Sequence, residues 1–140
     1  KIYKLRSLKK TNFDKTKQVV KDDQRLLKIG KFIRRFSVDE LPQFFNVLNG
    51  DMSIVGPRPH MVEHDIHYSK LFFNFLKRHK CNPGLTGWAQ VNGLRGATPN
   101  PEIMKRRMEF DLWYLNNWTI WLDIYIIFKT FYALFKYKGD

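Results

Sequence analysis

The chain has 140 residues, a formal net charge of +12 and a single cysteine, Cys81. This length suits one domain with a real hydrophobic core, and one cysteine excludes an internal disulfide framework. The excess of Lys and Arg favours polyanionic partners such as anionic lipid headgroups, nucleotides or nucleic acid. The chain begins at Lys1 without an initiator methionine or a signal sequence, so we expect it to be an excised region of a longer protein.

The N-terminal part of the chain predicts a strand, a loop and a helix. Residues 1–10 mix apolar and basic side chains and predict an edge strand, whose basic side chains we expect to be solvated unless they serve a functional site. Residues 11–21 are polar and predict a loop. Residues 22–36 predict a helix that opens at Asp22 and Asp23. Its expected buried stripe consists of Leu26, Leu27, Ile29, Phe32, Ile33 and Phe36.

Residues 37–59 are the most informative stretch. Within residues 40–48 the apolar positions Leu41, Phe44, Phe45 and Leu48 share one helical face, which predicts a short amphipathic helix. A proline in its first turn makes Asp39 the expected N-cap, where the helix dipole favours an ionised carboxylate and also suits a phosphate. From the helix alone, a purely structural cap, or a capping box between Ser37 and Glu40, is the more frequent explanation.

Pro57, Arg58 and Pro59 shift this balance toward function. Proline on both sides removes backbone freedom and backbone donors, which predicts a stiff loop that holds one guanidinium in place. Arginine is the side chain best suited to bidentate phosphate recognition. Two adjacent carboxylates followed by a rigid arginine are an arrangement expected for chemistry on a phosphate ester. A surface turn with a solvated arginine is the alternative.

Four motifs in this region and beyond it resemble the bacterial sugar transferase family, the monotopic polyprenyl-phosphate phosphoglycosyl transferases. They are DELPQ from residue 39, GDMS from residue 50, GPRP from residue 56 and PGLTGWAQVNG from residue 83. The resemblance covers nearly the whole chain. It implies a mostly helical α/β domain with a few short strands, forming one membrane-associated catalytic domain over residues 1–140 whose upstream membrane segment is absent.

The resemblance also implies a reaction. Asp39 would attack a UDP-sugar and form a covalent phosphosugar intermediate, from which undecaprenyl phosphate would take the sugar 1-phosphate. Magnesium is the implied cofactor, with Asp39 and Glu40 as its expected ligands, and Arg58 would stabilise charge on the transferred phosphoryl group. The division of labour between Asp39 and Glu40 is left open, with Glu40 either a magnesium ligand or a base for the lipid phosphate.

Further site residues follow from the same resemblance and from positions in the chain. Arg34 ends the predicted helix directly before Asp39, and Gln90 and Asn92 are polar residues of the glycine-rich stretch. The expected phosphate-binding residues are Arg58, Arg34, Lys4 and Arg78, and the expected supporting residues are Pro57, Pro59, Gln90, Asn92 and Asp111. Asp111 is expected to orient a site arginine, and an ordinary helix salt bridge is equally compatible with its position. Arg95 matches the form found in relatives that transfer hexose phosphates, which is a weak indication of the sugar.

The middle of the chain predicts helices and one loop. Residues 60–80 and 102–115 have helical patterns, and the glycine-rich residues 83–96 predict a loop with close backbone approaches. His60, His64 and His67 have helical spacing, but no cysteine or carboxylate grouping completes a tetrahedral ligand set. We therefore expect no zinc site.

Residues 118–138 are strongly apolar and aromatic. Asp123 and Lys129 interrupt a run already too short to cross a bilayer, so an amphipathic helix at the membrane interface is expected, and a core helix is the alternative. The expected location is the cytoplasmic face of the bacterial inner membrane, with membrane lipids as partners. A non-catalytic membrane scaffold stays as an alternative. Nucleic-acid binding ranks low because no recognised motif is present, and the oligomeric state, a homodimer included, is left open.

Overall fold

A computed structural model describes residues 1–9, 23–96, 98 and 100–136 of the chain. The elements in chain order are α1 (Lys28–Arg35), the 3-10 helix η1 (Val38–Glu40), α2 (Gln43–Leu48), β1 (Ser53–Val55), α3 (Val62–Leu71), the 3-10 helix η2 (Phe75–Lys80), β2 (Gly84–Thr86), α4 (Trp88–Val91), α5 (Pro101–Asn116) and α6 (Ile120–Lys136). The predicted α/β class, mostly helical with a few short strands, is confirmed.

The two strands form a small parallel sheet at the centre of the molecule. Ser53 pairs with Gly84, and Val55 pairs with Thr86. The backbones approach so closely here that a Cβ on Gly84 would lie 2.1 Å from the backbone nitrogen of Gly56, so only glycine fits. The prediction of a loop over residues 83–96 is therefore wrong in part. The close backbone approaches were expected, but they build β2 and lead into α4.

Two hydrophobic clusters hold the body together. Val55, Val91, Tyr114 and Ile126 pack the sheet against α4, α5 and α6, while Tyr68, Phe75, Met104 and Met108 join α3, η2 and α5. Helix α5 confirms the prediction over residues 102–115, and its N-cap is Asn100, whose side chain accepts a hydrogen bond from the Ile103 amide. The helical pattern of residues 60–80 divides into α3 and η2, because Phe72 adopts an extended conformation between them.

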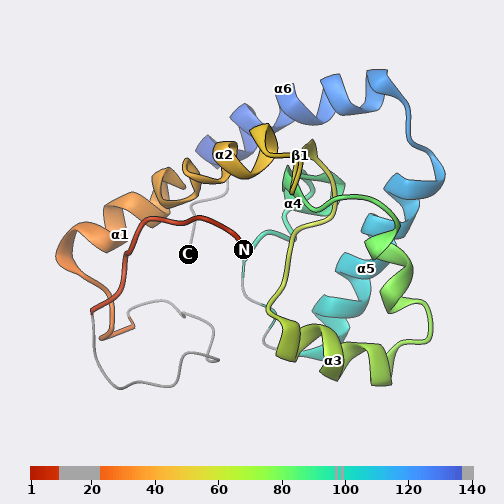
Figure 1. Cartoon of the computed structure of the whole chain (residues 1–140), viewed down its shortest axis with the longest axis horizontal. Helices are drawn as coiled ribbons and strands as arrows, with labels where there is room; N and C mark the ends of the chain where they lie inside the picture. Colours follow the sequence, from red (N-terminus) through yellow and green to blue (C-terminus); the bar gives the residue numbers. More distant parts are fainter. Residues whose placement is uncertain (10–22, 97, 99, 137–140) are drawn as a thin grey trace.

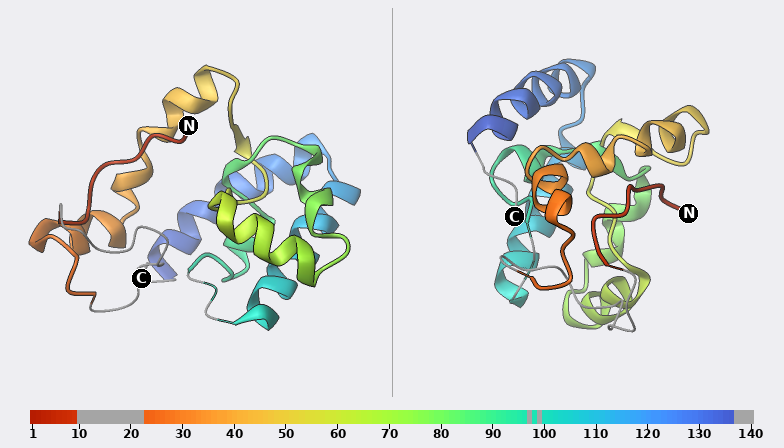
Figure 2. Two further views of the ribbon diagram at one scale, coloured as in Figure 1. Left: turned by 60° about the horizontal axis from the view of Figure 1, so that its bottom comes forward. Right: turned by 90° about the vertical axis from the view of Figure 1, so that its left-hand side faces the viewer.

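Residues 1–9 and 23–48 form an arm that extends to one side of the body (Figures 1 and 2). The extended N-terminal segment runs beside α1 and α2, and its one strand-like contact is an isolated antiparallel bridge between Leu8 and Leu26. The predicted edge strand is therefore wrong for the described residues. A side chain replaces the sheet partner, because the buried amide of Asn46 accepts from the Tyr3 nitrogen and donates to the Lys1 carbonyl.

The apolar side chains of the arm face outward, which contradicts the predicted burial. Helix α1 begins at Lys28 rather than near residue 22, and its residues Ile29 and Phe32 are exposed, as is Phe36 just after it. In and before α2, the exposed side chains are Leu41, Phe44, Phe45 and Leu48, whereas the polar Gln43 and Asn46 are buried. The reason is that α2 packs on the N-terminal segment through the polar side chain of Asn46. Residues 11–21 and Asp22 lie outside the described residues.

Helix α6 lies against the body through one face (Figure 1). Ile126 and Ala133 are buried, whereas Trp121, Phe128 and Phe131 are exposed. The buried face of α6 agrees with a core helix, and its exposed aromatic face agrees with an amphipathic helix. Binding of the exposed face to a membrane stays a prediction. Among the described helices, none is long and apolar enough to cross a membrane.

Candidate functional site

Asp39 and Glu40 lie in η1, a tight turn between α1 and α2. The turn starts at Ser37, which has a positive φ of 56°, a backbone conformation that non-glycine residues rarely adopt and that often marks functional sites. The N-cap position of α2 belongs to Pro42, and neither it nor Ser37 makes a side-chain capping bond. The predicted cap at Asp39 and the capping box are therefore wrong, because Ser37 redirects the chain before a helix can begin at residue 40.

Asp39 is only 3% exposed and faces one cation. The Lys4 Nζ atom lies 3.0 Å from its Oδ2 atom. The backbone holds this pair in register, because the Leu5 amide donates to the Asp39 carbonyl at 2.9 Å. The ordered N-terminal segment thus brings a lysine 35 positions away in the sequence to the buried carboxylate.

Glu40 is held by three cations. Arg58 Nη2 lies 2.5 Å from Oε1, Arg95 Nη2 lies 3.1 Å from Oε2 and Lys4 Nζ lies 3.5 Å from Oε1. Burial raises the pKa of this carboxyl, but Arg58, Lys4 and Arg95 outweigh burial and lower the pKa to about 2. Glu40 is therefore ionised at neutral pH. With three cations around two carboxylates, the site has an excess of positive charge and suits a diphosphate.

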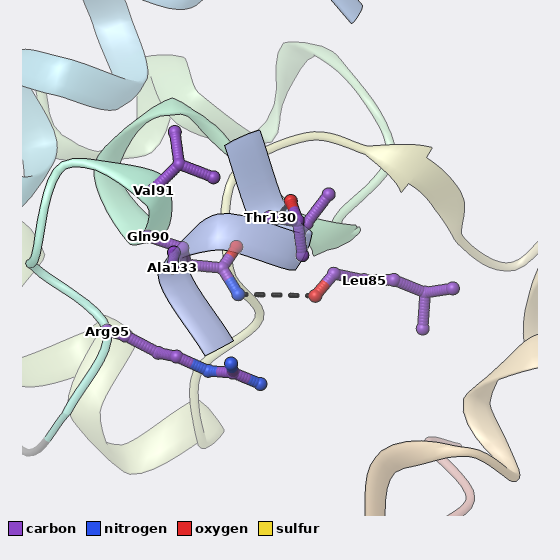
Figure 3. Close-up of a pocket in the computed structure, with 7 residues that line it drawn as sticks. Leu85, Gln90, Val91, Arg95, Thr130 and Ala133 are labelled. Atoms are coloured by element: carbon purple, nitrogen blue, oxygen red, sulfur yellow. Dashed lines mark hydrogen bonds between the residues drawn. The ribbon is translucent and has the colours of Figure 1, made fainter. Parts of the chain in front are cut away.

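Arg95 is the site residue that the sequence did not place beside the carboxylates. It is separated from Glu40 by 55 positions, and only the path of the chain after α4 brings the two together. The sequence places Arg95 inside the glycine-rich residues 83–96 and relates it only to the sugar, not to the carboxylates. Figure 3 shows the Arg95 side chain extending along a pocket that Gln90 and Thr130 also line.

The loop that carries Arg58 is tied down by its backbone. The Pro57 carbonyl accepts a hydrogen bond from the Gly84 amide at 3.0 Å, which extends the pairing between the two strands. The Arg58 carbonyl accepts from Arg78 Nη2 at 2.7 Å. Pro57 and Pro59 restrict the backbone on either side of Arg58, so the guanidinium is presented from a restrained segment, as the sequence predicts.

Arg78 and Asp111 lie in the interior, each 2% exposed. Arg78 Nη2 lies 2.8 Å from Asp111 Oδ2, so Asp111 does face an arginine. Burial raises the pKa of Asp111 to about 6 despite the neighbouring guanidiniums of Arg78 and Arg107. The direct phosphate contact predicted for Arg78 stays a prediction, and its burial favours a supporting role.

Three further predicted residues lie at more distant positions. Arg34 is half-buried in the last turn of α1, and its carbonyl accepts from the Ser37 amide at 3.1 Å. The Gln90 amide donates to the Leu85 carbonyl at 3.2 Å (Figure 3), and Asn92 accepts from Lys129 Nζ at 2.8 Å. Within the described residues, no hydrogen bond or ion pair joins these three side chains to Asp39 or Glu40.

The carboxylates fit magnesium only together with a substrate. Magnesium prefers oxygen ligands and commonly combines one or two carboxylates with substrate phosphates. Both Glu40 oxygens and one Asp39 oxygen already face nitrogen atoms of Lys4, Arg58 or Arg95. A phosphate that drew those cations away would free the oxygens and add its own. In the described part of the chain, no cluster of three or more His, Cys, Asp or Glu side chains could hold a metal.

Comparison with known proteins agrees with the motifs. The family model for the bacterial sugar transferase matches residues 1–137. The chain belongs to this family. UDP-glucose:undecaprenyl-phosphate glucose-1-phosphate transferases from Escherichia coli (strain K12) and Xanthomonas campestris pv. campestris are 51% and 56% identical over 140 and 113 residues, or 99% and 81% of this chain.

A third relative names another sugar. The UDP-N-acetylgalactosamine-undecaprenyl-phosphate N-acetylgalactosaminephosphotransferase of Aeromonas hydrophila is 40% identical over 130 residues, or 92% of this chain. The chain spans 30%, 23% and 30% of the lengths of these three relatives. These bacterial sugar transferases are therefore much longer than the segment they share with this chain.

Proposed function

We propose that this domain transfers a hexose 1-phosphate from a UDP-sugar to undecaprenyl phosphate. The observation that carries the proposal is the pair Asp39 and Glu40, enclosed by Lys4, Arg58 and Arg95. The names of the Escherichia and Xanthomonas relatives support UDP-glucose as the first donor to test. Such a transfer is the first step in building an exopolysaccharide, capsule or O-antigen repeat unit.

The reaction runs in two displacements at one phosphorus atom. First, a carboxylate oxygen of Asp39 attacks the sugar-proximal phosphorus. An oxygen–phosphorus bond forms, the bond to the bridging oxygen breaks, and its electron pair leaves with UMP. Then a phosphate oxygen of undecaprenyl phosphate attacks the same phosphorus, and the bond to Asp39 breaks to restore the carboxylate. This covalent route divides one transfer between two anions into two easier steps.

The surrounding cations make these displacements feasible. Arg58 and Arg95 share Glu40 in the free domain, and a diphosphate presents the same kind of oxygen atoms to both guanidiniums. Arg58 stabilises charge that develops on the transferred phosphoryl group, an effect worth about a hundred- to a thousandfold in rate for a single well-placed donor. Lys4 contacts both carboxylates and provides a further cation beside the attacking oxygen.

Asp39 and Glu40 are the residues that would hold magnesium. When bound, magnesium supplies positive charge that neutralises the diphosphate. Because Glu40 has a pKa of about 2, it offers an ionised oxygen at any physiological pH.

We also propose that the domain works on the cytoplasmic face of the bacterial inner membrane. The net charge of +12 favours anionic lipid headgroups. The arm and α6 expose aromatic side chains suited to the membrane interface, among them Phe32, Phe44, Phe45, Trp121 and Phe128. Replacing Phe44 and Phe45 with serine should weaken sedimentation with anionic vesicles. Unchanged sedimentation would contradict this placement.

The experiment for the transferase proposal is UMP release by the full-length protein in vesicles that contain undecaprenyl phosphate, magnesium and one UDP-hexose at a time. We expect Asp39→Asn to lower the rate at least about a thousandfold. The matched control is Glu109→Gln, an exposed carboxylate on α5, which should keep the parental rate. If no UDP-hexose supports release, or if Asp39→Asn is as active as the parent, the proposal fails and a non-catalytic membrane scaffold becomes the better explanation.

A further inference from the structure

His60 lies between two buried arginines. Arg78 Nη1 lies 2.7 Å from its Nδ1 atom, and Arg107 Nη1 lies 3.4 Å from its Nε2 atom. The imidazole is only 6% exposed. The two arginines come from different elements, η2 and α5, so one ring joins parts of the chain that are far apart in sequence.

Each of these arginines also holds the backbone of a loop that carries a site arginine. Arg78 Nη2 donates to the carbonyl of Arg58 at 2.7 Å. Arg107 Nη2 donates to the carbonyl of Gly96 at 2.6 Å, next to Arg95 in the chain. Since Arg58 and Arg95 are the two guanidiniums that hold Glu40, the buried contacts around His60 lead to both sides of the candidate site.

The protonation state of His60 fits this arrangement. Burial and the charges of Arg78 and Arg107 lower its pKa to about 4, although Asp65 opposes that shift. A neutral imidazole accepts a hydrogen bond at one nitrogen only. The 2.7 Å contact identifies Nδ1 as the acceptor for Arg78, while the longer contact at Nε2 is packing against Arg107.

The ring itself is held firmly. Phe75, which is fully buried, stacks on His60 with a centroid distance of 6.3 Å, and the Arg78 guanidinium lies 5.3 Å from the centroid of the same phenyl ring. Asp111 holds the other side of Arg78 at 2.8 Å. Because its neighbours are buried and paired, the His60 ring is restrained, and so are the backbone carbonyls of Arg58 and Gly96 that Arg78 and Arg107 hold.

We propose that His60 is a positioning residue that sets the distance between Arg58 and Arg95 around the candidate site. It contacts neither carboxylate. It acts on the Arg58 loop through its hydrogen bond with Arg78 and on the backbone at Gly96 by packing against Arg107. The proposal rests on the proposed function for its effect on turnover. Its effect on phosphate binding stands on the geometry alone, since the same two guanidiniums would bind a diphosphate whether or not transfer follows.

The test compares two variants of His60 with a control variant at another histidine. His60→Phe keeps a flat ring against Phe75 but removes the acceptor for Arg78. His60→Asn keeps an acceptor oxygen near the position of Nδ1. The control is His67→Phe, which makes the same replacement on an exposed position of α3.

Binding of UDP by calorimetry is the readout that needs no turnover. We expect His60→Phe to weaken UDP binding about tenfold, His60→Asn to recover most of that loss, and the control to match the parent. In the UMP-release assay, His60→Phe should raise KM for the UDP-sugar about tenfold. It should also lower kcat about tenfold. A change that only reduced the folded fraction would lower kcat and leave KM unchanged.

A double variant tests the route of the effect. If His60 acts through Arg58, then His60→Phe should cost no more than about twofold in UDP binding when Arg58→Ala is already present. Parental UDP binding by His60→Phe, or a full tenfold loss in the Arg58→Ala background, would overturn the inference. A parent that binds UDP but releases no UMP contradicts the transferase proposal and leaves this comparison of binding intact. A parent that binds UDP no better than Arg58→Ala contradicts both.

Discussion

The molecule contains two clusters of charged and polar side chains that differ in their access to solvent. The outer cluster consists of Lys4, Asp39, Glu40, Arg58 and Arg95, and the inner cluster of His60, Arg78, Arg107 and Asp111. The side chains of the outer cations are 39%, 23% and 26% exposed, for Lys4, Arg58 and Arg95 respectively. In the inner cluster, the side chains of Arg78 and Asp111 are each 2% exposed.

This difference in exposure indicates which arginines can change their ion-pair partner and which have to keep it. Arg58 and Arg95 are partly solvated, and a phosphate presents oxygen atoms like those of Glu40, so both guanidiniums can turn to a phosphate without losing a charged partner. Glu40, whose side chain is 12% exposed, then keeps Lys4. A buried charge that loses its partner is strongly unfavourable, so Arg78 has to keep Asp111 in every state of the domain. The outer cluster is therefore suited to binding and releasing a ligand, while the inner cluster holds the loops that present it.

The largest expected effect is on stability, from removal of the inner carboxylate. Asp111→Ala leaves the buried Arg78 guanidinium without its ion-pair partner, and we expect the free energy of unfolding to fall by about 3–5 kcal/mol. Urea unfolding followed by circular dichroism measures the change. Glu109→Ala, an exposed carboxylate on the same helix, is the matched control and should stay within about 0.5 kcal/mol of the parent. Equal losses for the two variants would show that the buried ion pair of Asp111 with Arg78 does not determine the loss of stability.

A middle-sized effect is expected from pH, with opposite signs for the two clusters. The pKa of Glu40 is lowered to about 2 from an ordinary 4.5, so its contribution to stability is complete above about pH 4.5 and is lost as the pH falls toward 2. The pKa of Asp111 is raised to about 6 from 3.8, so its contribution is complete below about pH 3.8 and is lost as the pH rises through 6.

Single amide substitutions separate these two titrations. Each group can change the free energy of unfolding by up to about 1.4 kcal/mol per pH unit within its window. Glu40→Gln should therefore flatten the acid side of the stability profile, and Asp111→Asn should flatten it between about pH 4 and 6. Chemical unfolding at a series of pH values measures both slopes. A parental slope in either variant would show that the carboxyl does not titrate as its surroundings indicate.

Local pattern was sufficient for one part of the site and for one long helix. Asp39 and Glu40 are neighbours in the sequence, and so are Arg58 and its two prolines. The periodicity of residues 102–115 predicted α5. These features depend on interactions over a few positions, which is the range over which sequence patterns carry information.

The remainder depends on contacts across the fold. Glu40 meets Arg95 over 55 positions, and His60 meets Arg107 over 47, so no spacing rule connects them. The helical spacing of His60, His64 and His67 suggests only a metal ligand and gives no sign that His60 contacts two arginines. Apolar periodicity identified the face that carries Phe44 and Phe45, but it could not show that this face would be exposed.

The smallest expected effect tests whether the outer cations are individually dispensable for stability. Lys4 is the most exposed of the three and contacts both carboxylates, at 3.0 Å and 3.5 Å. We expect Lys4→Ala to lower the free energy of unfolding by about 1–2 kcal/mol, less than Asp111→Ala, because Lys4 is 39% exposed and water that replaces its side chain can hydrate the Asp39 carboxylate. UDP binding should weaken several-fold and become less sensitive to salt, since one cation that attracts the diphosphate is gone. Lys9→Ala, at another exposed position of the N-terminal segment, is the control for both measurements. If Lys4→Ala lowered the free energy of unfolding as much as Asp111→Ala, the outer cluster would be as necessary for the fold as the inner one. Its cations could then not move from Glu40 to a substrate phosphate without destabilising the domain.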